Sequence, residues 1–400
     1  MTTTNASEVS TGKLRRVCLV CGGGDAPGVN AIVRGFVHAA RNVGIDVLGS
    51  HYGFEGLVAP DGIRPVTMAE IRGILPKGGC VLGCSTRVNP FFDGSGDKAR
   101  DLGPMIVSRL RALGVDALVL IGGDGTMLAA ERFTHAGMSC LGIPKTIDND
   151  LGQTDLTVGF ESAVETATHA IDALHSTAEA HARVMLLEVM GRNAGFIALH
   201  AGIAGGADVV LIPEIPYRLE RVIAKIRERE ALGLRFSIIV VSEGARPYGG
   251  DVLEIEAGRP GHLPRLGGAG ARLLHELNAA NLGHEVRLTV LGHLQRGGLP
   301  SAFDRTLGAE LGTYAAELCA RSELGRRIVV RDGQLTSIPL TGVPAASLHK
   351  RVDEGGALAR SARLLGIELG DDSAEPGAFM AGVREVPAAD SSGTAVAGPT

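Results

Sequence analysis

Short apolar runs alternate with stretches in which apolar positions recur at helical spacing, and this alternation continues along most of the chain. The runs are rich in Val, Ile and Leu, which is typical of parallel strands buried on both faces. Strand and helix in alternation predict parallel sheets that are covered by helices. We expect strands at 16–21, 45–49, 117–121, 139–143, 184–189, 208–212, 236–242, 286–291 and 327–330, and helices at 30–43, 161–178, 194–204, 219–232 and 270–282.

Two short motifs, one rich in Gly and one with two Asp residues, come directly after two of the predicted strands. GGDGT at 122–126 follows the run at 117–121, and PKTIDND at 144–150 follows the run at 139–143. Open α/β sheets bind their ligands outside the carboxyl ends of parallel strands. Either motif by itself also fits ordinary turn chemistry, but the two together favour a single ligand site that both of them line.

The side chains of these motifs supply what phosphoryl transfer requires. Glycines allow the backbone to approach a phosphate group, and the carboxylate of Asp124 is suited to hold Mg²⁺ beside it. Asp148 and Asp150 are two further carboxylates, and Thr146 is a short polar anchor. Phosphoryl transfer needs a phosphate cradle, a carboxylate that holds the metal and a base for the attacking hydroxyl. The sequence offers a candidate for each.

A glycine-rich turn follows the first predicted strand. Residues 22–28 read GGGDAPG and join that strand to a helix, so that backbone N–H groups and the helix N-terminus face the same point. This geometry suits an anion. The turn has neither the dinucleotide-binding spacing nor the Gly-Lys-Ser/Thr ending of a Walker loop. By itself it is equally consistent with a phosphate cradle and with a plain turn.

Basic residues stand near the ends of several predicted strands. One such residue is usually solvated or structural, but several of them in a chain with a phosphate cradle better suit a sugar phosphate. A carboxylate after the strand at 236–242 is placed to accept hydrogen bonds from hydroxyl groups. The basic residues are Arg183, Arg192, Arg287, His293 and Arg296, and the carboxylate is Glu243.

Bulk composition narrows the class of protein. The chain has 400 residues, of which 45% are apolar, and this length predicts two domains. The net charge of −5 and the lack of a long basic run argue against a nucleic-acid partner and against a membrane surface. No apolar stretch reaches membrane-spanning length without Gly or a charge, and the N-terminal residues lack the apolar core of a signal peptide.

The six cysteines are the remaining candidates for a metal site. Cys18/Cys21 and Cys80/Cys84 are spaced like paired metal ligands. However, Cys18 and Cys21 belong to one predicted strand, where an odd separation turns two side chains to opposite faces. We therefore interpret the cysteines as buried free thiols, which suit a reducing, cytoplasmic location.

Six motifs, in their order along the chain, resemble the 6-phosphofructokinase family from about residue 14 to about residue 365. They are GGGDAPGVNAIVRG, GGDGT, PKTIDND, EVMGRNAG, SEG and GHLQRGG. The resemblance implies a glycolytic, Mg²⁺-dependent enzyme that moves the γ-phosphoryl group of ATP to the 1-hydroxyl of fructose 6-phosphate. It also implies an α/β fold of two three-layer αβα lobes with parallel-rich sheets and an active-site cleft between them.

The resemblance divides the chain into two discontinuous lobes. A nucleotide-binding lobe would comprise 14–159 plus 295–345, and a sugar-phosphate-binding lobe would comprise 160–294 plus 346–366. The remaining segments, 1–13 and 367–400, are predicted to be disordered, since the second of them is small and polar in composition.

The resemblance also assigns roles to individual residues. Asp148 would be the base and Arg192 would stabilise the transferring phosphoryl group, with Gly24 and Thr146 in support and Asp124 holding the metal. ATP would contact Gly23, Gly24, Arg87, Val88, Gly123, Asp124, Gly125 and Thr126. Fructose 6-phosphate would contact Thr146, Ile147, Asp148, Arg183, Met190, Gly191, Arg192, Glu243, Arg287, His293, Leu294, Gln295 and Arg296.

Two of these residues carry an implication about assembly. Arg183 and Arg287 resemble arginines that the family supplies to the sugar phosphate from a neighbouring subunit. We therefore expect a homo-oligomer, with a tetramer favoured over a dimer.

The phosphoryl donor depends on two positions. In the family, Gly at position 125 goes with ATP, because an Asp there would crowd and repel the α-phosphate. Lys145 resembles pyrophosphate-dependent members, but a Lys can pair with a phosphate of either donor. Gly125 therefore favours ATP, and a pyrophosphate-dependent phosphotransferase is the first alternative. A second is another kinase class that shares GGDGT, and a third is a nucleotide or sugar-phosphate sensor without catalysis.

Overall fold

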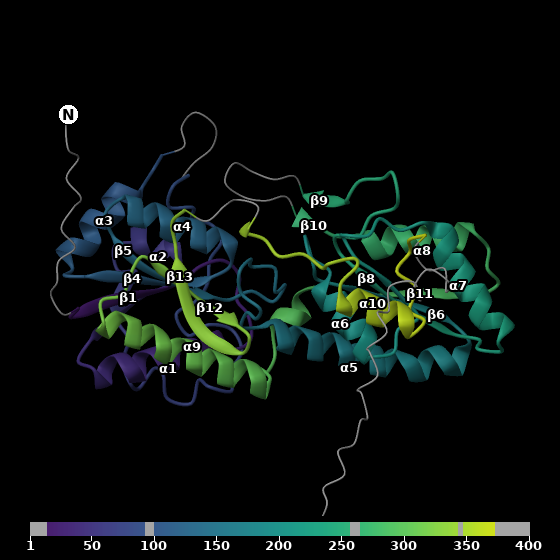
Figure 1. The fold of residues 1–400 in the computed structure, drawn as a ribbon, viewed down its shortest axis with the longest axis horizontal. Helices are drawn as coiled ribbons and strands as arrows, with labels where there is room; N and C mark the ends of the chain where they lie inside the picture. Colours follow the sequence, from purple (N-terminus) through teal and green to yellow (C-terminus); the bar gives the residue numbers. More distant parts are fainter. Residues whose placement is uncertain (1–13, 93–99, 257–264, 343–346, 373–400) are drawn as a thin grey trace, which may run out of the picture.

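The computed structural model describes residues 14–92, 100–256, 265–342 and 347–372. It contains two large sheets that lie side by side (Figure 1). The first has the strand order β13-β12-β5-β4-β1-β2-β3, and the second has the order β11-β6-β8-β7. The first sheet consists of β1 (Arg16–Cys21), β2 (Asp46–Ser50), β3 (Ile63–Pro65), β4 (Ala117–Gly122), β5 (Ser139–Pro144), β12 (Arg326–Arg331) and β13 (Gln334–Pro339), and the second of β6 (Val184–Val189), β7 (Val209–Leu211), β8 (Ser237–Ser242) and β11 (Val286–Val290).

All nine predicted strands are present, and they pair in parallel. The first sheet also has two antiparallel edge strands, β3 and β13, which the alternation of apolar runs did not predict. β13 is joined to β12 by Asp332 and Gly333, both of which have positive φ angles, 50° and 72°. Asp-Gly is a strong signal for a two-residue hairpin turn. A small antiparallel pair, β9 (Glu254–Glu256) with β10 (Arg265–Leu266), lies outside both sheets.

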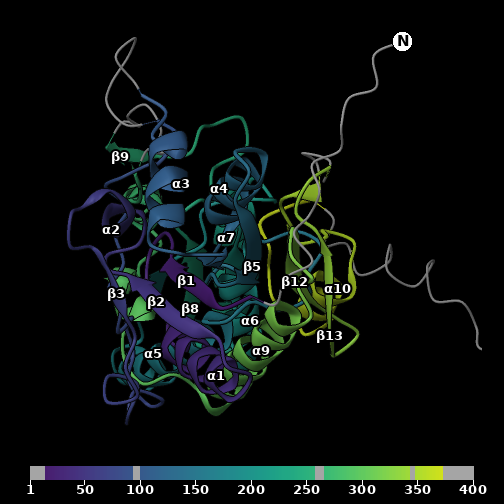
Figure 2. The same cartoon turned by 90° about the vertical axis from the view of Figure 1, so that its left-hand side faces the viewer.

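Helices cover both faces of each sheet, as Figures 1 and 2 show. One continuous apolar core lies between one face of each sheet and α1, α5, α6, α9 and α10. Separate cores fill the opposite faces, under α2 to α4 in the first sheet and under α7 and α8 in the second. The helices are α1 (Val29–Asn42), α2 (Phe54–Val58), α3 (Gly103–Ala112), α4 (Asp124–His135), α5 (Phe160–His181), α6 (Phe196–Ala204), α7 (Leu219–Ala231), α8 (Ala269–Ala279), α9 (Ala302–Ala320) and α10 (Ala357–Leu364).

The cysteine interpretation holds in part. Cys18 and Cys21 are buried in different cores, on opposite faces of β1, as the odd separation predicts. Cys140 and Cys319 are also buried, whereas Cys80 and Cys84 are only half-buried. All six thiols are free.

The chain crosses between the two sheets three times. It leaves the first sheet after β5, builds the second sheet, and returns through a short 3-10 helix, η2 (Gly292–Arg296), to α9 and β12. It then crosses again to α10. Asp304, near the start of α9, connects the segment of the second crossing to that of the first. Its carboxylate accepts hydrogen bonds from the backbone of Gly159 (2.7 Å) and Ser162 (2.8 Å), at the start of α5.

The predicted start of the disordered tail, at 367, is wrong. Ile367 and Leu369 are buried, and Glu368 pairs in parallel with Val209 beyond the edge of β7. The open edge of the second sheet gives this segment backbone partners, which the local composition does not reveal. The rest of the predicted tail, 373–400, and the N-terminal segment 1–13 lie outside the described residues.

Candidate active site

The glycine-rich turn and the GGDGT motif come together because β1 and β4 are neighbours. Gly22 N donates to the carbonyl oxygen of Ile121 at 2.9 Å. The buried Thr126 lies so close that a Cβ at Gly22 or at Gly122 would be 2.4 or 2.2 Å from its Oγ1. Only glycine permits this approach. The two motifs therefore lie side by side at the carboxyl edge of the sheet.

Lys145, in the loop after β5, lies under this turn. Its side chain is buried, and Nζ donates to the carbonyl oxygen of Gly22 (3.0 Å) and to that of Gly24. Burial lowers its pKa below the ordinary value. Two of its three donors are thus used to hold the glycine-rich turn.

Asp124, which follows β4, and Asp148 and Asp150, which follow β5, are close enough for their charges to interact. The pKa of Asp148 is raised to about 6 and that of Asp150 to about 7, in both cases mainly by burial and in smaller part by the charge of Asp124. Oδ1 of Asp148 is buried and accepts no hydrogen bond from the residues that the structure describes. Thr146 Oγ1 accepts a hydrogen bond from the backbone of Asp148 at 3.2 Å. A buried carboxylate with a free acceptor and a raised pKa is suited to take a proton.

Residues of the second sheet reach the same carboxylates. The charges of Arg296 and Arg192 lower the pKa of Asp148, and that of Glu243 raises it. Arg192 and Glu243 follow β6 and β8, which are neighbouring strands. Their loops touch, because a Cβ at Gly244 would lie 2.1 Å from the carbonyl oxygen of Arg192. The carboxyl ends of both sheets therefore line one site.

The η2 segment joins the two halves of this site. Arg296 Nη1 donates to the carbonyl oxygen of Asp25 at 3.1 Å, so the guanidinium lies against the glycine-rich turn. Gln295 is fully buried, and its Oε1 accepts from Met190 N at 2.7 Å. His293 and Leu294 are exposed. The side chain of Gln295 thus holds the backbone of the Met190 loop and is not presented to solvent.

The other predicted contacts differ in accessibility. Ile147 is fully buried, and Val88 packs against the core. Arg87 is exposed and lines a cavity of about 500 Å³ with Tyr52 and Glu55, beyond the carboxyl end of β2. The predicted backbone contacts Gly23, Gly123 and Gly191 lie in the loops after β1, β4 and β6.

Arg183 and Arg287 lie elsewhere in the chain. Arg183 immediately precedes β6, and Arg287 is the second residue of β11, where it is the register partner of Met185. Met190 and Arg192 follow the opposite end of β6, and a strand of this length spans about 17–20 Å. Within one chain these two arginines are therefore remote from Asp148.

Sequence reasoning missed two residues of the last crossing segment. His349 Nδ1 lies 3.8 Å from Asp124 Oδ2. Lys350 N donates to the carbonyl oxygen of Asp150 at 2.7 Å, and its Nζ donates to those of Thr154 and Asp155 at 3.0 and 2.8 Å. No strand precedes this segment, so the rule that placed the other site residues could not find it.

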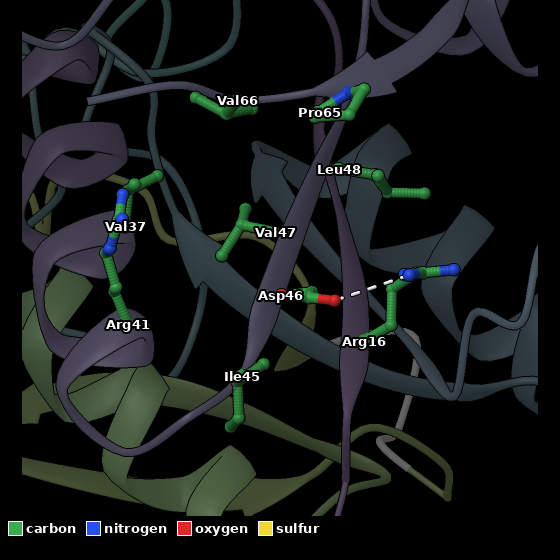
Figure 3. Close-up of a pocket in the computed structure, with 9 residues that line it drawn as sticks. All are labelled: Arg16, Val37, Arg41, Ile45, Asp46, Val47, Leu48, Pro65 and Val66. Atoms are coloured by element: carbon green, nitrogen blue, oxygen red, sulfur yellow. Dashed lines mark hydrogen bonds and ion pairs between the residues drawn. The ribbon is translucent and has the colours of Figure 1, made fainter. Parts of the chain in front are cut away.

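A second cavity, of about 350 Å³, lies at the opposite edge of the first sheet (Figure 3). It is bordered by the ion pair between Arg16 and Asp46, 3.3 Å long, at the amino ends of β1 and β2. It is therefore separate from the carboxylate cluster. Apolar side chains of α1, β2 and the segment after β3, such as Val37, Val47 and Val66, form much of its wall.

The donor chemistry of the site fits a hard divalent cation that is shared with phosphate oxygens. Within the described ranges, no three His, Cys, Asp or Glu residues are grouped to hold a metal by themselves. Mg²⁺ commonly takes one or two carboxylates and completes its shell with phosphates and water. Asp124, whose side chain is 45% exposed, is available for that kind of binding.

No helix in the described part of the chain is long and apolar enough to cross a membrane.

Comparison with known proteins agrees with this geometry. The sequence model of the family described as Phosphofructokinase matches residues 16–319. An ATP-dependent 6-phosphofructokinase of Chloroflexus aggregans is 45% identical over 362 residues, covering 90% of this chain and 99% of the relative. A pyrophosphate–fructose 6-phosphate 1-phosphotransferase of Streptomyces coelicolor is 44% identical over 334 residues, covering 82% and 94%. The phosphofructokinase structure from Saccharomyces cerevisiae superposes with a TM-score of 0.71 at 29% identity, covering 82% of this chain and 45% of that one.

Proposed function

The chain belongs to the phosphofructokinase family, and from this premise we propose that it transfers the γ-phosphoryl group of ATP to the 1-hydroxyl of fructose 6-phosphate. The products are fructose 1,6-bisphosphate and ADP. The observation that carries the proposal is the environment of Asp148. Its carboxylate is buried, has a free acceptor atom, and is influenced by charges from both sheets. A base in that position lies between the two halves of the site, from which the two substrates would approach.

Each part of the site has a distinct task in the proposed reaction. The carboxylate of Asp148 takes the proton of the attacking hydroxyl as the bond to phosphorus forms. Arg192 stabilises the negative charge on the transferring group, and the backbone of the glycine-rich turn holds the donor phosphates. Glu243 accepts hydrogen bonds from sugar hydroxyls. Thr146 keeps the Asp148 loop in place through its hydrogen bond to the backbone.

The reaction of this family requires a divalent metal, and we propose Mg²⁺ held through Asp124. When bound, it supplies positive charge at the phosphate oxygens. Burial first, and then the negative charge of Asp124, raise the pKa values of Asp148 and Asp150, and this concentration of negative charge supports a cation there. His349 lies beside Asp124 and is a further neighbour of this position.

ATP is the proposed donor because the space around residue 125 is open. A Cβ at Gly125 would meet nothing within 4 Å, so a nucleotide α-phosphate has room beside α4. The cavity near Arg87, lined also by Tyr52 and Glu55, is the proposed place for the rest of the nucleotide. Lys145 does not favour pyrophosphate, since it is occupied by the carbonyl groups of the turn.

Initial rates on fructose 6-phosphate, measured with ATP and then with pyrophosphate, test this proposal. We expect kcat/KM to be larger with ATP by at least an order of magnitude. The 44% identity to a pyrophosphate-dependent enzyme makes the opposite ranking the second candidate. Binding of both substrates without product from either donor would identify a sensor.

We further propose that residues 14–159 plus 295–345 bind the nucleotide and that 160–294 plus 346–366 bind the sugar phosphate. Arg183 and Arg287 would serve the sugar phosphate of a neighbouring subunit in a homo-oligomer, with a tetramer favoured. Their distance from Asp148 within one chain supports this, since an arginine must lie within hydrogen-bond reach of the phosphate that it binds.

Subunit mixing tests the shared site. The variants Asp148→Asn and Arg287→Ala are each expected to be nearly inactive at low sugar-phosphate concentration. If Arg287 acts in trans, exchange of subunits creates sites with both residues intact, and activity returns. If it acts in cis, every site keeps one lesion. A mixture that stays inactive after proven exchange would rule out the shared site.

A further inference from the structure

Arg183 and Arg287 are not independent side chains in this structure, because both bind Glu285. Arg183 Nε donates to Oε2 of Glu285, and Arg287 Nη2 donates to Oε1. One carboxylate therefore engages two guanidinium groups, one through each of its oxygens.

The backbone brings these three side chains to one edge. β6 and β11 pair in parallel, with Val184 opposite Val286, and Val184 N donates to the carbonyl oxygen of Glu285 at 3.0 Å. All three side chains remain accessible, since their exposed fractions are 25% for Arg183, 43% for Glu285 and 57% for Arg287. A ligand can reach the arginines without any rearrangement of the strands.

The arrangement has the chemistry of an anion site. Proteins bind phosphate as well as carboxylate by placing two guanidinium groups against two oxygens of one anion. A phosphate monoester offers one more oxygen than a carboxylate and a charge of up to two. Because both anions use the same donors, they compete for the two arginines.

We propose that Glu285 holds the place of the sugar phosphate between Arg183 and Arg287, and that it must be displaced when the substrate of a neighbouring subunit binds. Glu285 thereby sets the affinity for fructose 6-phosphate. This inference rests on the proposed function, because it takes the two arginines to be ligands of the sugar phosphate.

The substitution Glu285→Gln tests the proposal, since it keeps the size of the side chain and removes the charge. An exposed ion pair is weak, so releasing both arginines should lower KM for fructose 6-phosphate by about three- to tenfold. We expect only KM for fructose 6-phosphate to change, while kcat and KM for ATP stay the same. The Ki of inorganic phosphate, as a competitor of the sugar phosphate, should fall in parallel.

A matched control is available on α9. Glu317 forms an exposed ion pair with Arg321 at 3.0 Å on a helix that contacts the first sheet, and Glu317→Gln should leave both KM values unchanged. An unchanged or higher KM for fructose 6-phosphate in Glu285→Gln would overturn the proposal. It would mean that Glu285 only orients the two arginines.

The variant Arg287→Ala separates this inference from the function on which it rests. If Arg287→Ala raises KM for the sugar phosphate while Glu285→Gln does not lower it, the arginine assignment stands and the role of Glu285 is wrong. If Arg287→Ala leaves that KM unchanged, Arg287 does not bind the sugar phosphate, and both statements fall.

Discussion

Two aspartates with buried carboxylate oxygens, Asp148 after β5 and Asp304 at the start of α9, differ in their hydrogen bonds. Asp304 is fully buried and accepts hydrogen bonds from the backbone of Gly159 and Ser162 and from the hydroxyl of Ser162 at 2.6 Å. Asp148 is close to the same sheet, yet its buried Oδ1 accepts none from the described residues. Burial raises the pKa of both carboxyl groups.

Under the proposed function, one residue type serves structure at position 304 and chemistry at position 148. The hydrogen bonds of Asp304 compensate its burial and connect the two chain crossings. Asp148 keeps an unused acceptor, which costs stability and leaves the atom available for a proton.

The sharpest way to test the contrast is to neutralise Asp148. Asp148→Asn should lower kcat by about 10²–10⁴-fold, the usual contribution of a general base. Substrate affinities should change much less, since the side chain keeps its shape. Steady-state kinetics with both substrates varied will measure this. A kcat close to that of the wild type would remove Asp148 from the mechanism.

Adding a carboxylate at position 125 tests whether a charge near the active site affects activity without affecting stability. Gly125→Asp places a charge where a Cβ has no neighbour, so the thermal stability should barely change. A like charge beside the nucleotide α-phosphate costs several kcal/mol, so kcat/KM for ATP should fall by about 10²–10³-fold. Some activity with pyrophosphate is then expected.

The matched control for that variant is Gly125→Asn, which has nearly the same size but no charge. If charge repulsion dominates, the Asn variant keeps far more ATP activity than the Asp variant. Equal losses in the two would mean that crowding alone excludes the nucleotide. Wild-type kcat/KM for ATP in Gly125→Asp would contradict the account of donor selection.

The structural aspartate should show the reverse pattern. Asp304→Asn turns an amide donor toward backbone and hydroxyl donors, and we expect a loss of about 2–4 kcal/mol in stability. Thermal unfolding at fixed protein concentration, with Glu317→Gln as an exposed control, will report it. The folded fraction should keep its KM values. A melting temperature within a degree of the wild type would show that the junction at α5 and α9 tolerates the change.

The smallest effect concerns the stability of the active-site variant. The pKa of Asp148 is about 6 in the folded chain, against an ordinary value of 3.8. Between these values the folded chain holds a proton that the unfolded chain has lost, so the unfolding free energy falls as pH rises through this window. Above pH 6 the full cost of the buried charge remains.

Asp148→Asn removes that cost and should therefore be more stable than the wild type at pH 8, by up to about 2 kcal/mol. The gain should shrink at pH 5, where the wild-type carboxyl is largely protonated. Melting temperatures without substrates or Mg²⁺, at both pH values, test this. A variant less stable than the wild type at pH 8 would mean that Asp148 is compensated by Arg296 and Arg192.

Local sequence was sufficient to place the proposed site residues that follow a buried parallel strand. The apolar runs predicted all nine parallel strands. The motifs after them predicted the glycine-rich turn, the Asp148 loop and the Arg192 and Glu243 loops, because parallel strands bring their carboxyl ends to one edge. The antiparallel strand β13 was missed, although Asp332-Gly333 carries its signal.

Only the tertiary structure decided which partners the side chains have. Lys145 is bound to two carbonyl groups of the glycine-rich turn, and Gln295 to the backbone of Met190, although their sequence positions are more than a hundred residues from these partners. His349 reaches Asp124 from a segment that no strand precedes. Glu285 joins Arg183 to Arg287 across neighbouring strands. Hydrogen bonds and charges act over a few ångströms in space, and no periodicity along the chain encodes which distant segments come that close.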